Sequence, residues 1–341
     1  MPSLEEIVQA LLESRAYPGA PAKVELMQTG NSLIFLAGEY VYKVKKPVSL
    51  GYLDYSTLEK RLYYCQREIE LNRRLCAHAY LGVVPITAEK GRLRVEGEGQ
   101  PIEYAVKMRY LPQDRMLNVL LPARQVTAEM VTAVAHRLAD FHALAATSPE
   151  INNFGSVEIV TTNSEENFSR TERYIGSAIS RQGYNRLKTY SDAFIKANSN
   201  LFSKRVTGGK IKDCHGDLHT AHICFLPTSD SGIAGICIYD CIEFNDRFRY
   251  CDVASEIAFL AMDLDAYGRS DLSKRFVNDY VTFSGDNTLL QLLDFYKCYR
   301  AYVRGKVACF TLDDLLISEE VKARTLAEAK KYFELAETYI I

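Results

Sequence analysis

The 341-residue sequence predicts an α+β protein, with a small, mainly antiparallel sheet and one long helix preceding a larger, mainly α-helical part. Three observations lead to this prediction. Apolar and polar residues alternate through much of the first hundred or so positions, which is typical of strands with one buried face. Within that region, residues 58–76 instead repeat apolar side chains at three-and-four spacing, which indicates an amphipathic helix. Helical patterns then dominate the chain from residue 112 to its end.

The first strands are expected within residues 23–46, in the runs VELMQ, LIFLA and YVYKVKK. TGNS separates the first two runs, and GE between the last two suits a tight hairpin turn. In the third run Lys43 and Lys45 share one face, because side chains alternate along a strand. Pro47 ends this strand, since proline cannot donate to a ladder.

The long helix over residues 58–76 is expected to bury one face, and Glu68 borders that face. Strand character returns in LGVVPIT, RLRVEG and PIEYAVKMRYL. The composition changes near Leu111, which predicts a first domain over residues 1–111 and a second over residues 112–341.

The second part contains an amphipathic helix over residues 127–145 and long helical patterns near its end. Residues 151–210 are polar, rich in Asn and Ser, and only weakly periodic. The short apolar segments HICFL and GICIYD enclose TSDSG, a pattern that favours a hairpin.

Composition excludes several classes of protein. The net charge of −2 argues against a protein that binds nucleic acid or an anionic membrane through its overall field. No apolar run reaches the length of a membrane span, and acidic residues stand where a secretory signal carries basic ones. Ser3 and Glu6 instead have capping-box spacing. The nine cysteines show no repeated spacing, so we expect free thiols and a cytoplasmic location.

Residues 213–225, DCHGDLHTAHICF, hold three of the six histidines. A short loop around Asp217 could present a carboxylate to a substrate hydroxyl. Asp240 ends the apolar run GICIYD, a common way to place a ligand for a hard cation at the edge of a cleft. Together with a lysine on an upstream strand, these groups meet the needs of phosphoryl transfer: a base, a metal ligand and a cation for phosphate oxygens.

HGDLHTAHI resembles the HGDLHxxNI catalytic loop of the aminoglycoside phosphotransferase-like branch of the protein-kinase fold. TGNSLIFLAGEYVYKVKKP resembles the phosphate-covering hairpin with its lysine strand, and REIELNRRL the helix with the partner glutamate. EYAVKMRYL resembles the strand that enters the adenine hinge, and YDCIEFNDRFRYCDVASEIAFL the metal-aspartate segment. The resemblance implies a two-lobed kinase-like fold, with residues 1–111 as the nucleotide-covering N-lobe and 112–341 as the C-lobe.

The sequence is most similar to an uncharacterised kinase-like group whose members often continue into a P-loop kinase domain. Its only GGK, residues 208–210, is followed by Ile and does not form a Walker A sequence, so that domain is not expected in these residues.

The resemblance assigns roles to individual residues. Asp217 would be the catalytic base or the anchor of the substrate hydroxyl, and Asp240 the principal Mg²⁺ ligand. Lys43 would contact the α- and β-phosphates of ATP, and Glu68 would pair with it. Lys45 and Glu70 are the neighbouring alternatives for this pair. Gly30 is the only glycine in the TGNS turn. Because this turn is poor in glycine, few of its backbone amides would bind phosphate.

Further residues follow from the same alignment. His219 stands where protein kinases have the lysine that approaches the γ-phosphate, while His215 and Asp252 would brace the catalytic loop. The adenine hinge would comprise Met108, Arg109 and Tyr110. His222 occupies the position of the second metal ligand, where the family has asparagine. An imidazole suits Mn²⁺, Zn²⁺ or Fe²⁺ better than Mg²⁺, so Mn²⁺ is a possible alternative metal.

The predicted activity is transfer of the γ-phosphoryl group of ATP to a small-molecule hydroxyl, with residues 151–210 as a possible substrate lid. Acidic side chains in that segment could bind a cationic acceptor: Glu158, Glu165, Glu166 and Glu172. Two alternatives stay open. One is a weakly active or inactive nucleotide-binding pseudokinase, because of His222. The other is a zinc protein that uses His215, His219 and His222, since three imidazoles suit zinc.

Overall fold

The structure is a computed structural model that describes residues 2–89, 91–226, 235–314 and 317–340. The chain forms two compact units, and each is made of two separate stretches of sequence. The first unit comprises Met1–Val119 and Ala221–Asp246, and the second comprises Leu120–Thr220 and Arg247–Ile341.

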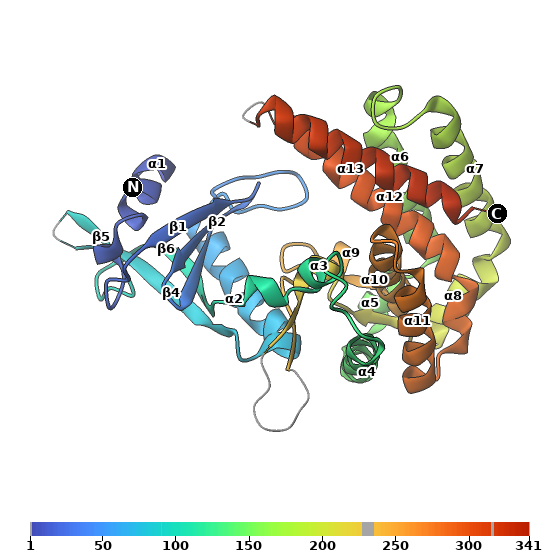
Figure 1. Ribbon diagram of the computed structural model, residues 1–341, viewed down its shortest axis with the longest axis horizontal. Coiled ribbons are helices and arrows are strands. Elements are labelled where there is room, and N and C mark those ends of the chain that lie inside the picture. Colours follow the sequence, from blue (N-terminus) through green and yellow to red (C-terminus); the bar gives the residue numbers. More distant parts are fainter. Residues whose placement is uncertain (1, 90, 227–234, 315–316, 341) are drawn as a thin grey trace. The chain divides into compact units, whose positions relative to one another are not determined.

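The first unit is built on a six-stranded antiparallel sheet in the order β1-β2-β3-β6-β4-β5 (Figure 1). Its strands are β1 (Val24–Gln28), β2 (Ser32–Ala37), β3 (Tyr40–Lys45), β4 (Tyr80–Glu89), β5 (Arg92–Val95) and β6 (Pro101–Arg109). The strands expected from the alternating pattern are confirmed. The turn between β2 and β3 has Gly38 at φ 65°, a left-handed conformation that glycine adopts without strain.

Helix α2 (Leu58–Cys76) packs against β4 and β6 of this sheet. Its ends coincide with the predicted ones, and Thr57 caps its N-terminus by accepting a hydrogen bond from the amide of Lys60. Cys65 and Ile69 are buried on the predicted apolar face, and Glu68 is buried beside them. The helix therefore carries a carboxylate into the interior of the unit.

A second helix, α1 (Leu4–Leu11), precedes the sheet and is followed by the turn η1 (Ser14–Ala16). The predicted capping box is confirmed, because Ser3 and Glu6 exchange backbone-to-side-chain hydrogen bonds. Residues of α1 share a core cluster with apolar residues of the sheet, including Leu33 and Phe35.

The returning stretch of the first unit forms the hairpin β8 (Ile223–Phe225) and β9 (Ile236–Ile238), as predicted. Its expected turn, TSDSG, lies outside the described residues. Strand β9 contacts α2, and an isolated bridge joins Met116 to Cys224 near η2 (Gln113–Arg115). The predicted lobes at residues 1–111 and 112–341 stay a prediction, and the compact units divide the chain differently.

One prediction about the cysteines is wrong. Cys76 at the end of α2 and Cys237 in β9 form a disulfide, with Cα atoms 4.6 Å apart. The sequence could not indicate this pair, because 161 residues separate the two cysteines and only the contact between α2 and β9 brings them together. The other seven cysteines are free thiols, as expected.

The second unit is mainly helical (Figure 1). Its longer helices are α4 (Ala128–Leu144), α6 (Val157–Thr171), α7 (Arg181–Ala197), α10 (Val253–Ala266), α11 (Ser270–Ser284), α12 (Leu293–Thr311) and α13 (Glu319–Thr338). Shorter elements are α3 (Leu117–Leu120, shared with the first unit), α5 (Pro149–Asn153), η3 (Glu172–Tyr174), α8 (Ser199–Thr207), η4 (Thr220–His222), α9 (Asp246–Arg249) and η5 (Asn287–Gln291). Strands β7 (Ile211–Asp213) and β10 (Tyr250–Asp252) pair antiparallel.

Helix α10 lies in the centre of this unit and is buried on nearly all sides. A core cluster joins it to α12, α13, α6 and α7. The weakly periodic residues 151–210 are therefore helices that take part in the core, although their role as a lid stays a prediction. None of the described helices is long and apolar enough to cross a membrane.

Candidate active site

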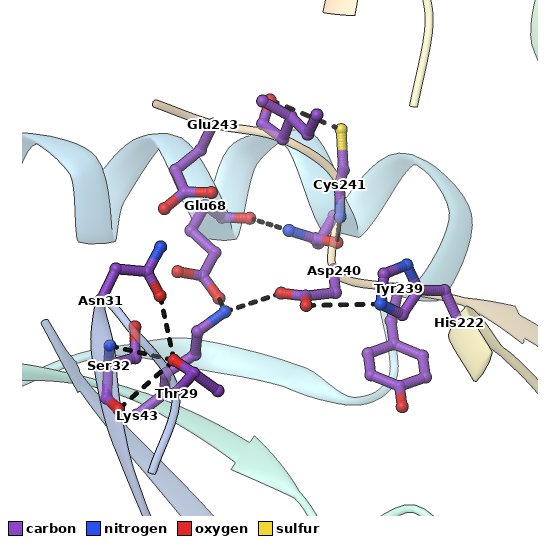
Figure 2. Close-up of polar contacts among 12 residues, drawn as sticks. Thr29, Asn31, Ser32, Lys43, Glu68, His222, Tyr239, Asp240, Cys241 and Glu243 are labelled. Atoms are coloured by element: carbon purple, nitrogen blue, oxygen red, sulfur yellow. Dashed lines mark hydrogen bonds and ion pairs between the residues drawn. The ribbon is translucent and has the colours of Figure 1, made fainter. Parts of the chain in front are cut away.

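In the first unit, Lys43 of β3 lies between two carboxylates (Figure 2). Its Nζ is 2.9 Å from Oε1 of Glu68 on α2 and 2.6 Å from Oδ1 of Asp240, which follows β9. Burial lowers the pKa of Lys43, but the carboxylates of Asp240 and Glu68 outweigh burial and raise it well above its usual value. Lys43 is therefore a fixed positive charge beside Asp240.

Lys45, the alternative lysine, has a different environment on the same face of β3. Its side chain is fully buried and its Nζ lies 2.7 Å from Oε2 of Glu68, with Glu243 in close contact. The hydroxyl of Tyr55 donates to Oε1 of Glu243 at 2.6 Å. Lys45 thus belongs to an enclosed ion-pair network, whereas 14% of the Lys43 side chain is exposed.

Glu70, the alternative carboxylate, is exposed on α2 and pairs with Arg67 at 2.6 Å. Glu68 is instead inaccessible to solvent and contacts both lysines. Burial raises the pKa of Glu68, but Lys43 and Lys45 outweigh that effect and lower it. Glu68 is therefore the carboxylate that the fold brings to the lysine strand.

The segment around Asp240 is held to α2 by a hydrogen-bonded chain. The amide of Cys241 donates to Oδ1 of Asn72 at 2.8 Å, and Nδ2 of Asn72 donates to the carbonyl of Glu68 at 2.9 Å. The amide of Asp240 donates to the hydroxyl of Tyr80 at 3.2 Å. Asp240 itself has φ 62°, a left-handed conformation that is uncommon for a residue with a side chain and is tolerated best by Asp and Asn. These contacts hold the backbone that carries its carboxylate.

His222 lies beside Asp240 in the same unit, with Nε2 3.6 Å from Oδ2 (Figure 2). Its carbonyl accepts from the amide of Tyr239 at 3.0 Å, which orders the backbone next to the imidazole. The Asp240 side chain is 41% exposed, so ligands can reach it. In this ion-pair network, the ammonium groups of two lysines contact three carboxylates, so the network has a formal charge of −1. A bound cation would offset that charge. The members are Lys43, Lys45, Glu68, Asp240 and Glu243. One carboxylate and one imidazole form a donor set that fits a divalent cation.

The turn between β1 and β2, TGNS, is ordered by side chains. The Thr29 hydroxyl accepts from the amide of Ser32 at 3.0 Å and donates to Oδ1 of Asn31 at 3.0 Å (Figure 2). Nζ of Lys46 donates to the carbonyl of Thr29 at 2.6 Å. A Cβ added at Gly30 would meet nothing within 4 Å, so the turn does not depend on glycine for space.

The predicted hinge residues lie at the end of β6. Met108 is buried, whereas Tyr110 is 42% exposed. The amide of Arg109 donates to the carbonyl of Ala79, and the amide of Tyr110 donates to the carbonyl of Glu39. Because these two amides already have partners, an adenine contact at this edge would rely on carbonyls or side chains. The hinge assignment stays a prediction.

In the second unit, Glu256 of α10 holds the backbone of the HGDLH loop. Its carboxylate accepts the amides of His215 and Gly216, each with a shortest distance of 2.8 Å. Nε2 of His142 lies 3.0 Å from the same carboxylate, and Nδ1 of His142 lies 2.8 Å from the hydroxyl of Tyr280. This buried network fixes the start of the loop through Glu256, a residue that was not predicted from the sequence.

Asp217 follows directly in this loop, with its side chain 36% exposed. Its amide donates to Nδ1 of His215 at 3.3 Å, so His215 orients the loop from within. His219 is mostly buried, with Nε2 3.5 Å from Oδ2 of Asp217 and its ring beside Phe259. Asp263 anchors the end of the loop by accepting from the amide and hydroxyl of Thr220, at 2.9 and 2.6 Å.

The described hydrogen bonds of Asp252 do not go to residues 215–219. It caps α10 by accepting the amide of Ala254 at 2.8 Å, and it accepts two hydrogen bonds from Arg205. Its predicted bracing role is not tested by these contacts. The structure thus gathers Lys43, Glu68, Asp240 and His222 in one unit, and gathers Asp217, His219, His215 and Asp252 in the other.

Replacing Glu256 by glutamine is expected to lower the free energy of unfolding by roughly 3 kcal/mol at pH 7. Burial raises the pKa of Glu256, but His142, His215 and the Gly216 amide outweigh burial and lower it to about 2. Because the pKa of the folded state is depressed, this stabilisation is present above the ordinary value of 4.5 and is lost as pH falls from there towards about 2.

The measurement is urea denaturation followed by circular dichroism, since the chain has no tryptophan. Glu334→Gln, a change at an exposed glutamate of α13, serves as the control. An equal loss of stability for Glu256→Gln at pH 3 and pH 7 would contradict the charge-based explanation.

The hypothesis of a zinc site at His215, His219 and His222 stays a prediction, because His222 belongs to a different unit from the other two histidines. Among the described residues of the second unit, His215 and His219 do not occur together in any group of closely spaced potential metal ligands.

The sequence matches no family model. It is 34% identical over 286 residues to the uncharacterized protein Rv2004c of Mycobacterium tuberculosis, in an alignment that covers 84% of this chain and 55% of that protein. The uncharacterized protein Mb2027c of Mycobacterium bovis shows the same identity and coverage. The chain therefore spans about half the length of these relatives.

Three solved structures resemble this chain in fold. The GDP complex of aminoglycoside 2′-phosphotransferase-IIIa has a TM-score of 0.54 and 12% identity, covering 93% of this chain and 94% of that chain. The amicoumacin kinase complex with AMP-PNP and Ca²⁺ has a TM-score of 0.53 and 12% identity, covering 98% and 94%. A choline/ethanolamine kinase family protein from Mesorhizobium loti has a TM-score of 0.52 and 10% identity, covering 98% and 99%. The chain thus has the two-lobed α+β kinase-like fold of aminoglycoside phosphotransferases and choline/ethanolamine kinases.

Proposed function

We propose that this protein transfers the γ-phosphoryl group of ATP to a hydroxyl of a small-molecule acceptor. The observation that carries the proposal is the position of Lys43, which Glu68 holds at 2.9 Å next to Asp240 at 2.6 Å. A fixed cation beside an accessible carboxylate is the arrangement that phosphoryl transfer requires at the nucleotide phosphates. The kinase-like fold supports the same conclusion.

In the proposed reaction, the acceptor oxygen forms a bond to the γ-phosphorus. The bond from that phosphorus to the β,γ-bridging oxygen breaks, and its electron pair leaves with ADP. The carboxylate of Asp217 accepts the proton of the acceptor hydroxyl and later releases it to solvent. Lys43 stabilises the phosphate oxygens, and His219 orients the Asp217 carboxylate from 3.5 Å.

The residues that would hold a divalent cation are Asp240 and His222. When bound, such an ion supplies charge neutralisation at the phosphate oxygens. The imidazole donor favours Mn²⁺ relative to the amide oxygen that the family has at this position.

His222→Asn is expected to shift the metal preference about ten-fold from Mn²⁺ towards Mg²⁺, because an amide oxygen replaces a nitrogen donor. The measurement is the thermal stabilisation of the ADP complex as each metal is titrated, which does not depend on turnover. His136→Asn, at an exposed histidine of α4, is the control. Unchanged relative affinities for the two metals would remove His222 from the proposed metal site.

An ADP-release screen tests the proposed function. It would cover sugars, amino alcohols, aminoglycosides, phosphorylated metabolites and proteins, each with Mg²⁺ and with Mn²⁺. Release that depends on both the acceptor and a divalent metal is the expected result. If ATP stabilises the protein but no acceptor gives ADP, the protein is a nucleotide-binding module instead. If ATP neither stabilises it nor is consumed, the proposal is wrong.

A further inference from the structure

Helices α6, α9 and α12 of the second unit carry four basic side chains, and three of them act electrostatically on the fourth, Lys306. We call them the Lys306 cluster: Lys306, Arg170, Arg247 and Arg300. Burial and the charge of Arg170 lower the pKa of Lys306 to about 8, and Arg247 and Arg300 act in the same direction. Glu166 is the main group that opposes them. Lys306 therefore lies in a local field that disfavours its own positive charge.

One carboxylate is already committed within this cluster. Both oxygens of Glu166 accept from Arg247, at 3.0 and 2.6 Å, and Arg247 also donates to Oδ1 of Asn163 at 2.7 Å. Lys306 donates to a neutral partner, Oδ1 of Asn167, at 2.5 Å. The cluster thus holds more positive charge than its nearest carboxylate neutralises.

Arg300 connects the cluster to the catalytic loop. It donates to the carbonyl of Gly216 at 3.3 Å, immediately before Asp217, and to the carbonyl and hydroxyl of Ser255 at 3.3 and 3.1 Å. Its guanidinium lies 4.8 Å from the ring centre of Phe259, whose ring also contacts His219. The described hydrogen bonds of Arg300 thus go to neutral groups, and they leave its positive charge without a carboxylate partner among the described contacts.

Arg170 extends the cluster into a cavity of about 690 Å³. Two further arginines, Arg173 and Arg181, line this cavity together with Phe310 of α12. Phe310 stands four residues after Lys306 and so lies on the same face of α12. Its full lining is Ser169, Arg170, Glu172, Arg173, Arg181 and Phe310. Basic side chains therefore run from the loop that carries Asp217 to a cavity large enough for a small molecule.

We propose that the acceptor of this enzyme is an anion: a hydroxyl compound carrying a phosphate or carboxylate group, which Lys306 and Arg170 bind while its hydroxyl reaches Asp217. This inference rests on the proposed phosphotransferase function and names the acceptor class for the same site. Arginine and lysine are the side chains that bind phosphate and carboxylate oxygens with charge-assisted hydrogen bonds. The anion would supply the negative charge that the Lys306 cluster lacks.

An anionic acceptor is the opposite of the cationic acceptor expected from the acidic residues of segment 151–210. Glu166 is paired with Arg247, and the hydroxyl of Tyr184 lies 3.4 Å from Glu172. Glu158 and Glu165 are exposed on α6. Three of the six residues that line the cavity are arginines and one is Glu172, and Arg173 is paired with Asp313. With the Lys306 cluster beside them, basic side chains outnumber these carboxylates, so cationic compounds are expected to be poor acceptors.

The experiment compares four probes with related carbon skeletons. Glycerol 3-phosphate and glycerate are anions, glycerol is neutral, and 3-amino-1,2-propanediol is a cation. Binding to the full chain in the presence of ADP is measured by calorimetry and thermal shift, and turnover is measured by ADP release. The anions are expected to bind and to be used at least about ten-fold better than glycerol, in keeping with the strength of one charge-assisted hydrogen bond. The two anions distinguish phosphate from carboxylate recognition.

Lys306→Gln and Arg170→Gln are the informative variants. Each is expected to raise KM for the anionic acceptor about ten-fold with a much smaller change in kcat, because the anion is bound away from the reacting atoms. Lys306→Gln is also expected to raise Tm of the ligand-free protein at pH 7, since it removes a charge from a field of like charge. A purely structural lysine would show the opposite change. The control is Lys322→Gln, at an exposed pair with Glu319 on α13.

The outcomes separate this inference from the proposed function. Turnover that prefers the cationic or the neutral probe, or variants with unchanged KM and anion affinity, would overturn the anionic acceptor while leaving a phosphotransferase. Anion binding that requires Lys306 and Arg170 without ADP release from any acceptor would overturn the phosphotransferase and retain an anion site. Binding of inorganic phosphate alone, equal in all variants, would count against the site.

Discussion

Replacing Asp217 by asparagine is expected to lower kcat for phosphoryl transfer by roughly a thousand-fold, within the range that general bases contribute. Asparagine has the same shape but cannot accept the proton of the acceptor hydroxyl. The backbone amides on the N-terminal side of Asp217 are held by Glu256, and Thr220 beyond it is held by Asp263, so the loop should keep its conformation. The expected change is therefore chemical, with ATP affinity altered less than about three-fold.

The measurement is steady-state ADP release with the best acceptor, together with thermal stabilisation by ATP. Asp192→Asn is a matched control, because Asp192 is a partly exposed aspartate of α7 paired with Lys188 at 3.0 Å. If Asp217→Asn kept more than about a tenth of the wild-type kcat, the general-base role would have to be withdrawn.

Replacing Arg205 by alanine is expected to lower the free energy of unfolding by about 3–5 kcal/mol at pH 7. The Arg205 side chain is almost fully buried and bridges two buried carboxylates. It donates to Asp252 at 2.5 and 2.9 Å, and to Asp286 at 2.7 and 2.8 Å. Alanine would leave both carboxylates buried without a counter-ion, and such groups cost far more than exposed ones.

The sign of the pH dependence provides a second check. Burial raises the pKa of Asp286, but Arg205 outweighs burial and lowers it below 3.8. The stabilisation is thus present above that value and fades as pH falls below it, so the deficit of Arg205→Ala should shrink in acid. Urea denaturation at pH 7 and pH 3 measures both quantities.

Arg269→Ala is the surface control, since Arg269 pairs with Asp271, which is 63% exposed, and should change stability by less than about 1 kcal/mol. A similarly small change for Arg205→Ala would mean that the buried pair contributes little to folding.

The parts of the fold that could be predicted are those set by local periodicity. The ends of α2 and the capping box at Ser3 depend on neighbouring residues, and both are as expected. The segment 151–210 was only weakly periodic because polar residues occupy the buried faces of its helices. These buried polar residues include Ser164, Asn167, Thr171 and Ser191.

The groups that were missed are buried charges whose partners are distant in sequence. Glu243 lies 198 residues from Lys45, and Arg205 lies 47 residues from Asp252. In the sequence, each looks like an ordinary surface charge, because burial and pairing arise only when the units fold. Glu256 stands four residues after Asp252 in DVASEIAF, where its polar character within an apolar helix was the one available signal.

The order of the chain has a consequence for how the protein is made on the ribosome. The sheet, with Lys43, Lys45 and Glu68, is synthesised first, but Asp240 and Glu243 are added only after Leu120–Thr220 have been translated. Until residue 246 has been translated, Lys43 and Lys45 of the first unit lack two of their three carboxylate partners, Asp240 and Glu243. The interior of this unit therefore cannot reach its final packing early in synthesis. A fragment that stops at Val119 would have the same deficit, and useful truncations of this protein must extend at least to Asp246.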